Sequence, residues 1–121
     1  MTFPLSRLMS TATASYGVYA LADPWHLGRV LDPRHAADYD LLAQTYGARD
    51  LAVSSVGMLG KGPRTVSTAM LIRIACDVSD GLILAAKAPD RQTRQKVLGV
   101  TLGWAALNAV ALVTDRRRAR P

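Results

Sequence analysis

Three charged side chains inside one otherwise apolar segment limit what this chain can fold into. Residues 65–86 contain Arg73, Asp77 and Asp80 and no other charged residue. If the segment is a helix, offsets of four and seven residues place all three within an arc of about 60°. The other faces are apolar and carry Met70, Leu71, Ile72, Ile74, Val78, Leu82 and Ile83. Such a helix forms either the wall of a buried polar site or the charged wall of an ordinary bundle.

The composition indicates one domain over residues 1–121 and excludes some classes of protein. Half of the residues are apolar, all nine acidic residues are Asp, and the formal net charge is +6. The single cysteine, Cys76, excludes a disulfide within the chain. Because basic residues flank apolar segments and do not alternate with aromatic ones, we expect no nucleic-acid partner and interpret the arginines as membrane-edge residues.

The positions of proline and charge predict four helices, at about residues 5–22, 36–59, 64–86 and 92–114, followed by a frayed basic tail at 115–121. Between the first two helices, residues 24–36 are expected to form a connection. Residues 97–114 are eighteen consecutive residues without a charge, which is long enough for a membrane span. The alternative for the uncharged N-terminal run is a cleaved signal sequence.

These segments favour an all-α, antiparallel four-helix transmembrane bundle. A soluble bundle is the alternative, but it needs broad charged outer faces, and the first and fourth helices have none. The third helix would insert poorly alone, because each central charge costs about 2.5–3.5 kcal/mol. Its charges therefore need partners within a multi-pass membrane protein. Seven basic residues on one side against six on the other favour cytoplasmic N- and C-termini.

Each predicted helix carries one polar stripe. Lipid cannot satisfy polar groups, so the stripes should converge on the bundle axis. Two arginines can each hold a carboxylate with two hydrogen bonds. The candidate residues are Tyr16 and Tyr19 on the first helix, Tyr46, Arg49 and Asp50 on the second, Arg73, Asp77 and Asp80 on the third, and Trp104 and Asn108 on the fourth.

Unequal environments of the three aspartates would supply acid–base chemistry. Two carboxylates paired with arginine stay ionised, whereas a third that is desolvated and near like charges stays protonated. We therefore expect Asp50, Asp77 and Asp80 to be the catalytic residues of an isomerase, cyclase or epoxide-opening enzyme. Arg49, Arg73, the tyrosines, Trp104 and Asn108 would contact a lipophilic substrate from the bilayer. No cofactor or metal is expected, because nucleotide-binding and metal-binding motifs are missing from the sequence.

Two other hypotheses account for the same charges. In the first, the arginine–aspartate pairs lock helix packing in a structural or interaction protein. Alternatively, intramembrane carboxylates can relay protons in a transporter. Four short helices enclose a transport path poorly, so a transporter would require a homodimer, for which Gly99 and Gly103 offer a close-packing face.

One motif resembles a known family. Tyr46-Gly47-Ala48-Arg49-Asp50-Leu51-Ala52 is followed by an apolar helix, a short basic turn and a helix with a late aspartate. This order resembles a family of small four-helix integral membrane proteins of unknown function with a G-x-R-D-L-A-like motif in the second helix. The resemblance covers roughly residues 36–113. It implies the architecture, and it points to Arg49, Asp50 and one of Asp77 or Asp80.

Overall fold

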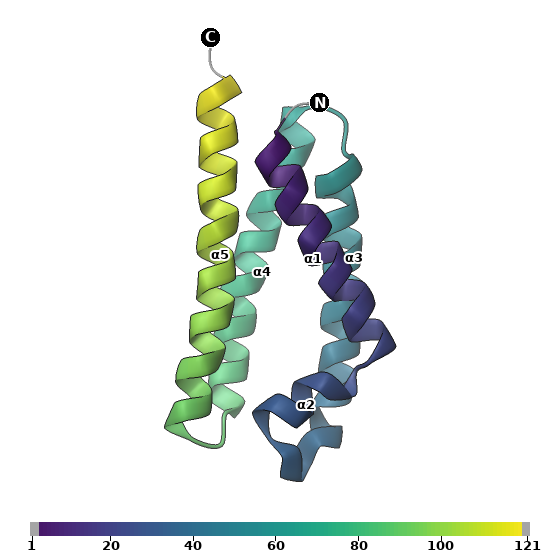
Figure 1. Cartoon of the computed structure of the whole chain (residues 1–121), viewed down its shortest axis with the longest axis vertical. Coiled ribbons are helices and arrows are strands. Elements are labelled where there is room, and N and C mark those ends of the chain that lie inside the picture. The colour runs from purple at the N-terminus through teal and green to yellow at the C-terminus, as the bar shows by residue number, and fades with distance from the viewer. Residues whose placement is uncertain (1–2, 120–121) are drawn as a thin grey trace.

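The chain is all-helical, as the sequence predicts. A computed structural model describes residues 3–119, apart from the side chains of residues 30, 31, 35 and 36. The described part contains no strand. Its elements are five α-helices, α1 (Pro4–Ala22), α2 (Trp25–Leu31), α3 (Asp40–Leu59), α4 (Pro63–Lys87) and α5 (Arg91–Ala119), and one 3-10 helix, η1 (Pro33–Tyr39) (Figure 1).

Residues 24–36 are more regular than the predicted connection. After the break at Pro24 the chain forms α2, and Pro33 then begins η1, so that the next long helix starts at Asp40 and not near residue 36. The entry into α2 is held by Asp23, whose Oδ2 accepts a hydrogen bond of 2.6 Å from Arg29 Nη2. This hydrogen bond holds the pKa of the Asp23 carboxyl below its usual value.

The predicted frayed tail is wrong for residues 115–119, which continue α5, while residues 120 and 121 lie outside the described part. The reason is Asp115, whose side chain is buried. Its carboxylate accepts hydrogen bonds from the backbone N–H groups of Leu5 (3.3 Å) and Ser6 (2.6 Å), in the first turn of α1. A carboxylate there pairs with unsatisfied amides and with the positive end of the helix dipole. This contact stabilises the helical conformation of α5 as far as Asp115 and beyond.

The turn between α3 and α4 is fixed by α1. Arg7 donates from Nη1 to the carbonyl oxygen of Met58 (2.8 Å) and from Nη2 to that of Gly60 (2.9 Å). These carbonyls lie at the C-terminal end of α3, where a cation is favourable. The reversal itself uses Gly62, whose φ of 83° lies in the left-handed region.

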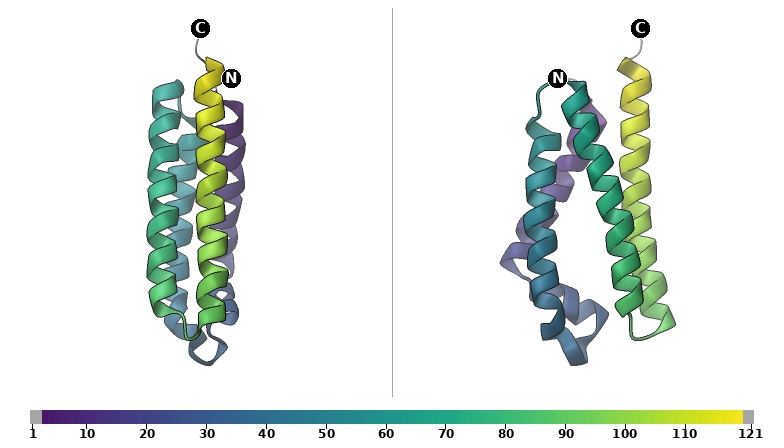
Figure 2. Two further views of the ribbon diagram at one scale, coloured as in Figure 1. Left: turned by 90° about the vertical axis from the view of Figure 1, so that its left-hand side faces the viewer. Right: turned by 180° about the vertical axis from the view of Figure 1, so that it is seen from behind.

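The long helices form two close pairs, α1 with α3 and α4 with α5, and both chain ends lie at the end of the molecule where α3 turns into α4 (Figure 1). Figure 2 shows the pairs from the side and from behind, with α2 and η1 at the opposite end. Two glycines bring α1 and α3 together: a Cβ at Gly17 would lie 2.8 Å from the carbonyl oxygen of Gly47. Gly99 and Gly103, the predicted close-packing face, meet nothing within 4 Å.

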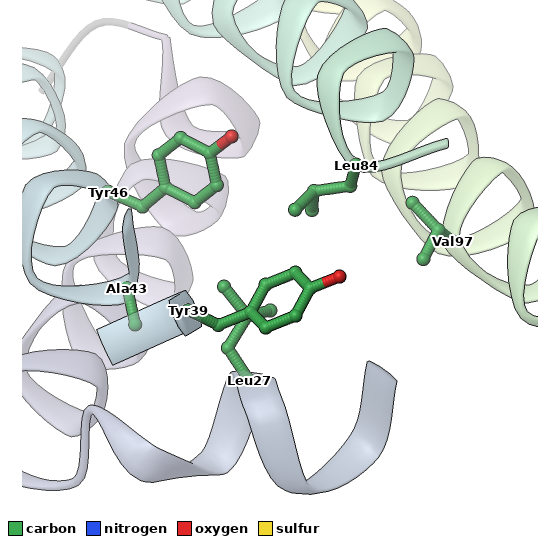
Figure 3. Close-up of a cluster of buried hydrophobic side chains, with 6 residues drawn as sticks. All are labelled: Leu27, Tyr39, Ala43, Tyr46, Leu84 and Val97. Atoms are coloured by element: carbon green, nitrogen blue, oxygen red, sulfur yellow. The ribbon is translucent and has the colours of Figure 1, made fainter. Parts of the chain in front are cut away.

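The interior has a polar middle between two apolar ends. One apolar cluster lies near α2 and consists of Leu27, Tyr39, Ala43, Tyr46, Leu84 and Val97 (Figure 3). The other lies near the chain ends and consists of Phe3, Val66, Met70, Ala111 and Leu112. Along α4, Arg73, Asp77 and Asp80 fall between Met70 and Leu84, so the charged side chains are separated from both ends of the molecule by apolar layers.

Large apolar side chains are exposed on the outer faces of α4 and α5. On α4, Leu71, Ile72 and Leu82 are exposed while Arg73, 2% exposed, is buried. The same holds on α5, where Val100, Leu107 and Val110 are exposed while Asn108 is buried. This distribution is the reverse of the usual one. Among the described helices, α5 alone is long and apolar enough to cross a membrane, where the sequence predicts four spans, and most of its apolar stretch is not covered by the rest of the described chain.

We expect Gly17→Ala to destabilise the fold by about 1–3 kcal/mol, because the added Cβ would meet backbone atoms of α3 that cannot move aside. The matched control is Gly103→Ala, where open space should leave a gain of about 0.5–1 kcal/mol from helix propensity. Chemical unfolding of the purified protein, followed by circular dichroism, measures both changes. Equal effects of the two substitutions would contradict the close crossing of α1 and α3.

Candidate functional site

Five charged side chains from two helices meet in the polar middle. Helical spacing on α4 puts Arg73, Asp77 and Asp80 on the face that turns inward, and all three are buried. Asp50, on α3, is buried opposite them, and Arg49 beside it is partly exposed. The structure therefore brings together all five of the charged residues singled out from the sequence.

Two guanidinium groups bind the three carboxylates, and both of them bind Asp50. Arg49 binds both oxygens of Asp80, at 2.8 Å from Nη1 to Oδ1 and 2.5 Å from Nη2 to Oδ2, and Nη2 also donates to Asp50 Oδ1 at 2.9 Å. Arg73 donates from Nη1 to the same Asp50 oxygen and from Nη2 to Asp77 Oδ1 at 2.6 Å. Arg73 Nη2 lies 3.8 Å from Asp80 Oδ2. Both arginines therefore link α3 to α4.

Several buried polar atoms at this site have no hydrogen-bond partner among the described residues. Asp77 Oδ2 and the hydroxyl of Tyr46 are two of them, and the others here are the Nε atoms of the two arginines and the hydroxyl of Ser54. A buried polar group without a partner costs about 1–3 kcal/mol. Asp77 Oδ2 is the one carboxylate oxygen of the cluster that is buried without such a partner among the described residues.

A cavity of about 250 Å³ adjoins the carboxylates and is partly open to the outside. All five α-helices contribute to its walls. Asp50, Asp77 and Asp80 all line it, whereas Arg49 and Arg73 do not. The remaining lining is Ala12, Thr13, Tyr16, Leu27, Tyr46, Leu84, Val100, Thr101 and Trp104. The site therefore combines a mostly apolar chamber with carboxylates along one part of its wall.

The aromatic candidates divide into two groups. Tyr46 and Trp104 line the cavity; the guanidinium carbon of Arg49 lies 4.8 Å from the Tyr46 ring centroid, and Trp104 Nε1 donates to the Thr13 hydroxyl at 3.0 Å. Tyr16 also lines the cavity, although part of its ring is exposed. Tyr19 does not, because its hydroxyl points to Asp23 Oδ2 at 3.3 Å.

Asn108 is placed near the site but not in it. It is fully buried on α5, and its Nδ2 donates to the carbonyl oxygen of Trp104 one turn earlier, at 2.8 Å. Its Oδ1 has no partner among the described residues. Asn108 does not line the cavity, so the structure does not place it against a bound substrate.

His26 is a neighbour of the site that the sequence did not reveal. Its Nδ1 lies 2.7 Å from the carbonyl oxygen of Asp23, which can only accept, so Nδ1 carries the proton. In the neutral ring Nε2 then accepts a hydrogen bond of 2.9 Å from the Tyr16 hydroxyl. The two residues are ten apart across the break at Pro24, a spacing without helical meaning. A loop histidine of this kind is expected to be solvated, whereas this one is joined to a residue of the cavity wall.

Neither a metal-binding cluster among the described residues nor a similar known protein helps to assign this site. Among residues 3–119 with described side chains, no group of three His, Cys, Asp or Glu residues is arranged to hold a metal ion. Comparison with models of protein families, with curated proteins and with solved structures gave no match. The family resemblance of the second helix therefore stays a prediction.

We expect Arg73→Met to destabilise the fold by about 3–5 kcal/mol, because it leaves buried carboxylates without their cation. Arg64→Met is the matched control: the same substitution at an exposed position on the same helix should change stability by less than about 0.5 kcal/mol. Unfolding curves of the two variants and the parent protein test this. If both variants lost the same stability, the Arg73 ion pairs would not hold α3 to α4.

Proposed function

We propose that the chain is an integral membrane protein, an antiparallel bundle of four long helices, and that it acts as a cofactor-independent acid–base enzyme on a lipophilic small molecule. The observation that carries the enzymatic part is the cavity of about 250 Å³ lined by Asp50, Asp77 and Asp80, one of which has a carboxylate oxygen without a partner. A protein whose ion pairs served packing alone would saturate its carboxylates and leave no chamber beside them.

The membrane part is supported by the inverted distribution of polarity. Charges buried between α3 and α4 and exposed Leu, Ile and Val on the outside suit a hydrocarbon solvent. Charges cost about 2.5–3.5 kcal/mol each at the centre of an isolated span. Pairing Arg49 and Arg73 with aspartates from both helices lowers that cost, which would let α3 and α4 insert beside α5. The small residues at the crossing of α1 and α3 are also those that membrane helices use for close contact.

Orientation is proposed from charge. Arg116, Arg117 and Arg118 extend α5 at the end of the molecule where the chain also begins (Figure 1). Lys61 and Arg64, in and after the turn between α3 and α4, lie at the same end. Clustered basic residues favour the cytoplasmic side, so we place both termini there.

The three carboxylates have unequal freedom to exchange a proton. Both oxygens of Asp80 are held by Arg49, and Asp50 Oδ1 is held by both arginines. Asp77 Oδ1 accepts a hydrogen bond from Arg73 alone among the described residues, whereas Asp50 Oδ1 has two guanidinium donors, and Asp77 Oδ2 is buried without a partner among those residues. We therefore assign proton transfer to Asp77 Oδ2 and the positioning of Asp77 to Arg73. Asp50 and Asp80 would fix the arginines and keep the local charge balanced.

The remaining wall defines what can bind. Leu27, Leu84 and Val100 supply apolar surface, and the buried Tyr46 hydroxyl can donate a hydrogen bond to a substrate oxygen. A volume of about 250 Å³ is near the lower end of small-molecule sites. The substrate is accordingly a small molecule with an apolar body, and isomerisation, cyclisation and epoxide opening all fit a single proton-transfer group without a cofactor.

We expect Asp77→Asn to reduce turnover by about a hundredfold or more while the protein remains folded, because the amide cannot exchange the proton. Lipophilic extracts of cells that express the parent chain, Asp77→Asn or the exposed control Asp38→Asn are compared by mass spectrometry. The expected product has either the mass of its precursor or that mass plus one water. It should appear with the parent chain and Asp38→Asn and be lost with Asp77→Asn. A product formed equally by folded Asp77→Asn would remove Asp77 from the mechanism.

A further inference from the structure

The charged residues that line the cavity all have the same sign. Asp50, Asp77 and Asp80 contribute to the wall, whereas no Lys, Arg or His whose side chain the structure describes does. The two arginines hold these carboxylates without lining the chamber themselves. With three carboxylates and two guanidinium groups, the ionised cluster has one negative charge in excess. A ligand in the cavity therefore meets uncompensated negative charge.

Two unpaired polar groups of the wall can accept hydrogen bonds or a positive charge. Asp77 is 6% exposed and its Oδ2 has no partner among the described residues. Tyr46 is also 6% exposed, with an unpaired hydroxyl. Figure 3 shows this hydroxyl directed away from α3 toward the side of Leu84, which is another lining residue. Tyr46 is not acidic and lies on α3, whereas Asp77 lies on α4, so the unpaired Tyr46 hydroxyl is an observation separate from the unpaired oxygen of Asp77.

Three aromatic rings also belong to the wall of the cavity. Tyr16, Tyr46 and Trp104 all line the cavity. The electron-rich faces of such rings attract cations, and more strongly where water is excluded. The ring of Tyr46 already has the guanidinium of Arg49 near it, at 4.8 Å. An anionic ligand would gain nothing from these rings and would be repelled by the carboxylates.

We infer that the cavity selects an apolar molecule with a single positive charge, of which an alkylammonium ion is the simplest example. The cationic centre would lie against Asp77 Oδ2, and the hydrocarbon against Leu27, Leu84 and Val100. This inference rests on the proposed function, because it names the substrate class of the same cavity. It favours reactions of a substrate that already carries a positive charge. It disfavours isomerisation through an enolate, whose negative charge would face three carboxylates.

Three probes of similar shape test the sign of the charge: cyclohexyltrimethylammonium, the neutral tert-butylcyclohexane and the anion cyclohexanecarboxylate. The protein is used as Trp25→Phe, which leaves Trp104 of the cavity wall as its one tryptophan, in vesicles of phosphatidylcholine. Saturable changes in tryptophan fluorescence report binding. We expect the cation to bind at least about tenfold more tightly than the neutral probe, and the anion not to bind. Asp77→Asn should weaken the binding of the cation on the order of tenfold and leave the affinity for the neutral probe unchanged. Asp38→Asn should change neither affinity.

The outcomes separate this inference from the proposed function. If the neutral probe binds as tightly as the cation, the cavity remains a lipophilic site but the inferred charge of its substrate is wrong. If no probe changes the fluorescence of Trp104, neither the inference nor the small-molecule site survives. If Asp77→Asn does not fold, the comparison of the three probes on the parent cavity still decides the sign of the charge.

Discussion

The arrangement depends on two guanidinium groups placed between three carboxylates in the middle of the molecule. Arg49 and Arg73 both reach across from one helix to carboxylates on the other, so α3 and α4 have one favourable alignment. Removing one member leaves a buried charge unpaired, which is costly where water is scarce. The apolar clusters at the two ends exclude water from this middle layer and thereby strengthen each ion pair.

The same interaction explains why a lock alone is an incomplete description. Arg73 satisfies one oxygen of Asp77 and leaves the other beside a chamber that all five α-helices help to form. The ion pairs thus keep a carboxyl group in a fixed position with one oxygen free. The proton transfer that we propose requires this combination of fixed geometry and an available atom. Tyr16 and His26 extend the polar network from the chamber to α2 at its edge.

Helical periodicity was sufficient to predict the polar faces but not their neighbours. Spacings of four and seven place Arg73, Asp77 and Asp80 on one face whatever the tertiary structure, so their meeting with Arg49 and Asp50 followed from the cost of burying a charge alone. Periodicity does not predict which side chains of a polar stripe reach the cavity. Tyr19 and Asn108 lie on the expected helices, yet Tyr19 turns to Asp23 and Asn108 turns back to its own helix.

Long-range contacts could not be predicted from the sequence, for a different reason. Asp115 looked like part of a frayed basic tail, because its partners, the amides of Leu5 and Ser6, are more than one hundred positions away. Gly17 and Gly47 carry no pairing signal in sequence, whereas a Cβ added at Gly99 or Gly103, which do form a motif, would meet nothing within 4 Å among the described residues. The helices α2 and η1 were hidden because short helices have little periodicity to detect.

The central claim is that charge is enclosed here while apolar side chains face hydrocarbon. Spin labels at Leu82→Cys and Leu107→Cys, both exposed in the structure, test it directly once Cys76 has been replaced by alanine and the protein reconstituted in vesicles. The account predicts that each label collides far more often with oxygen, which concentrates in lipid, than with a water-soluble nickel chelate. Frequent collisions with the nickel chelate at both positions would place these faces in water and contradict the account.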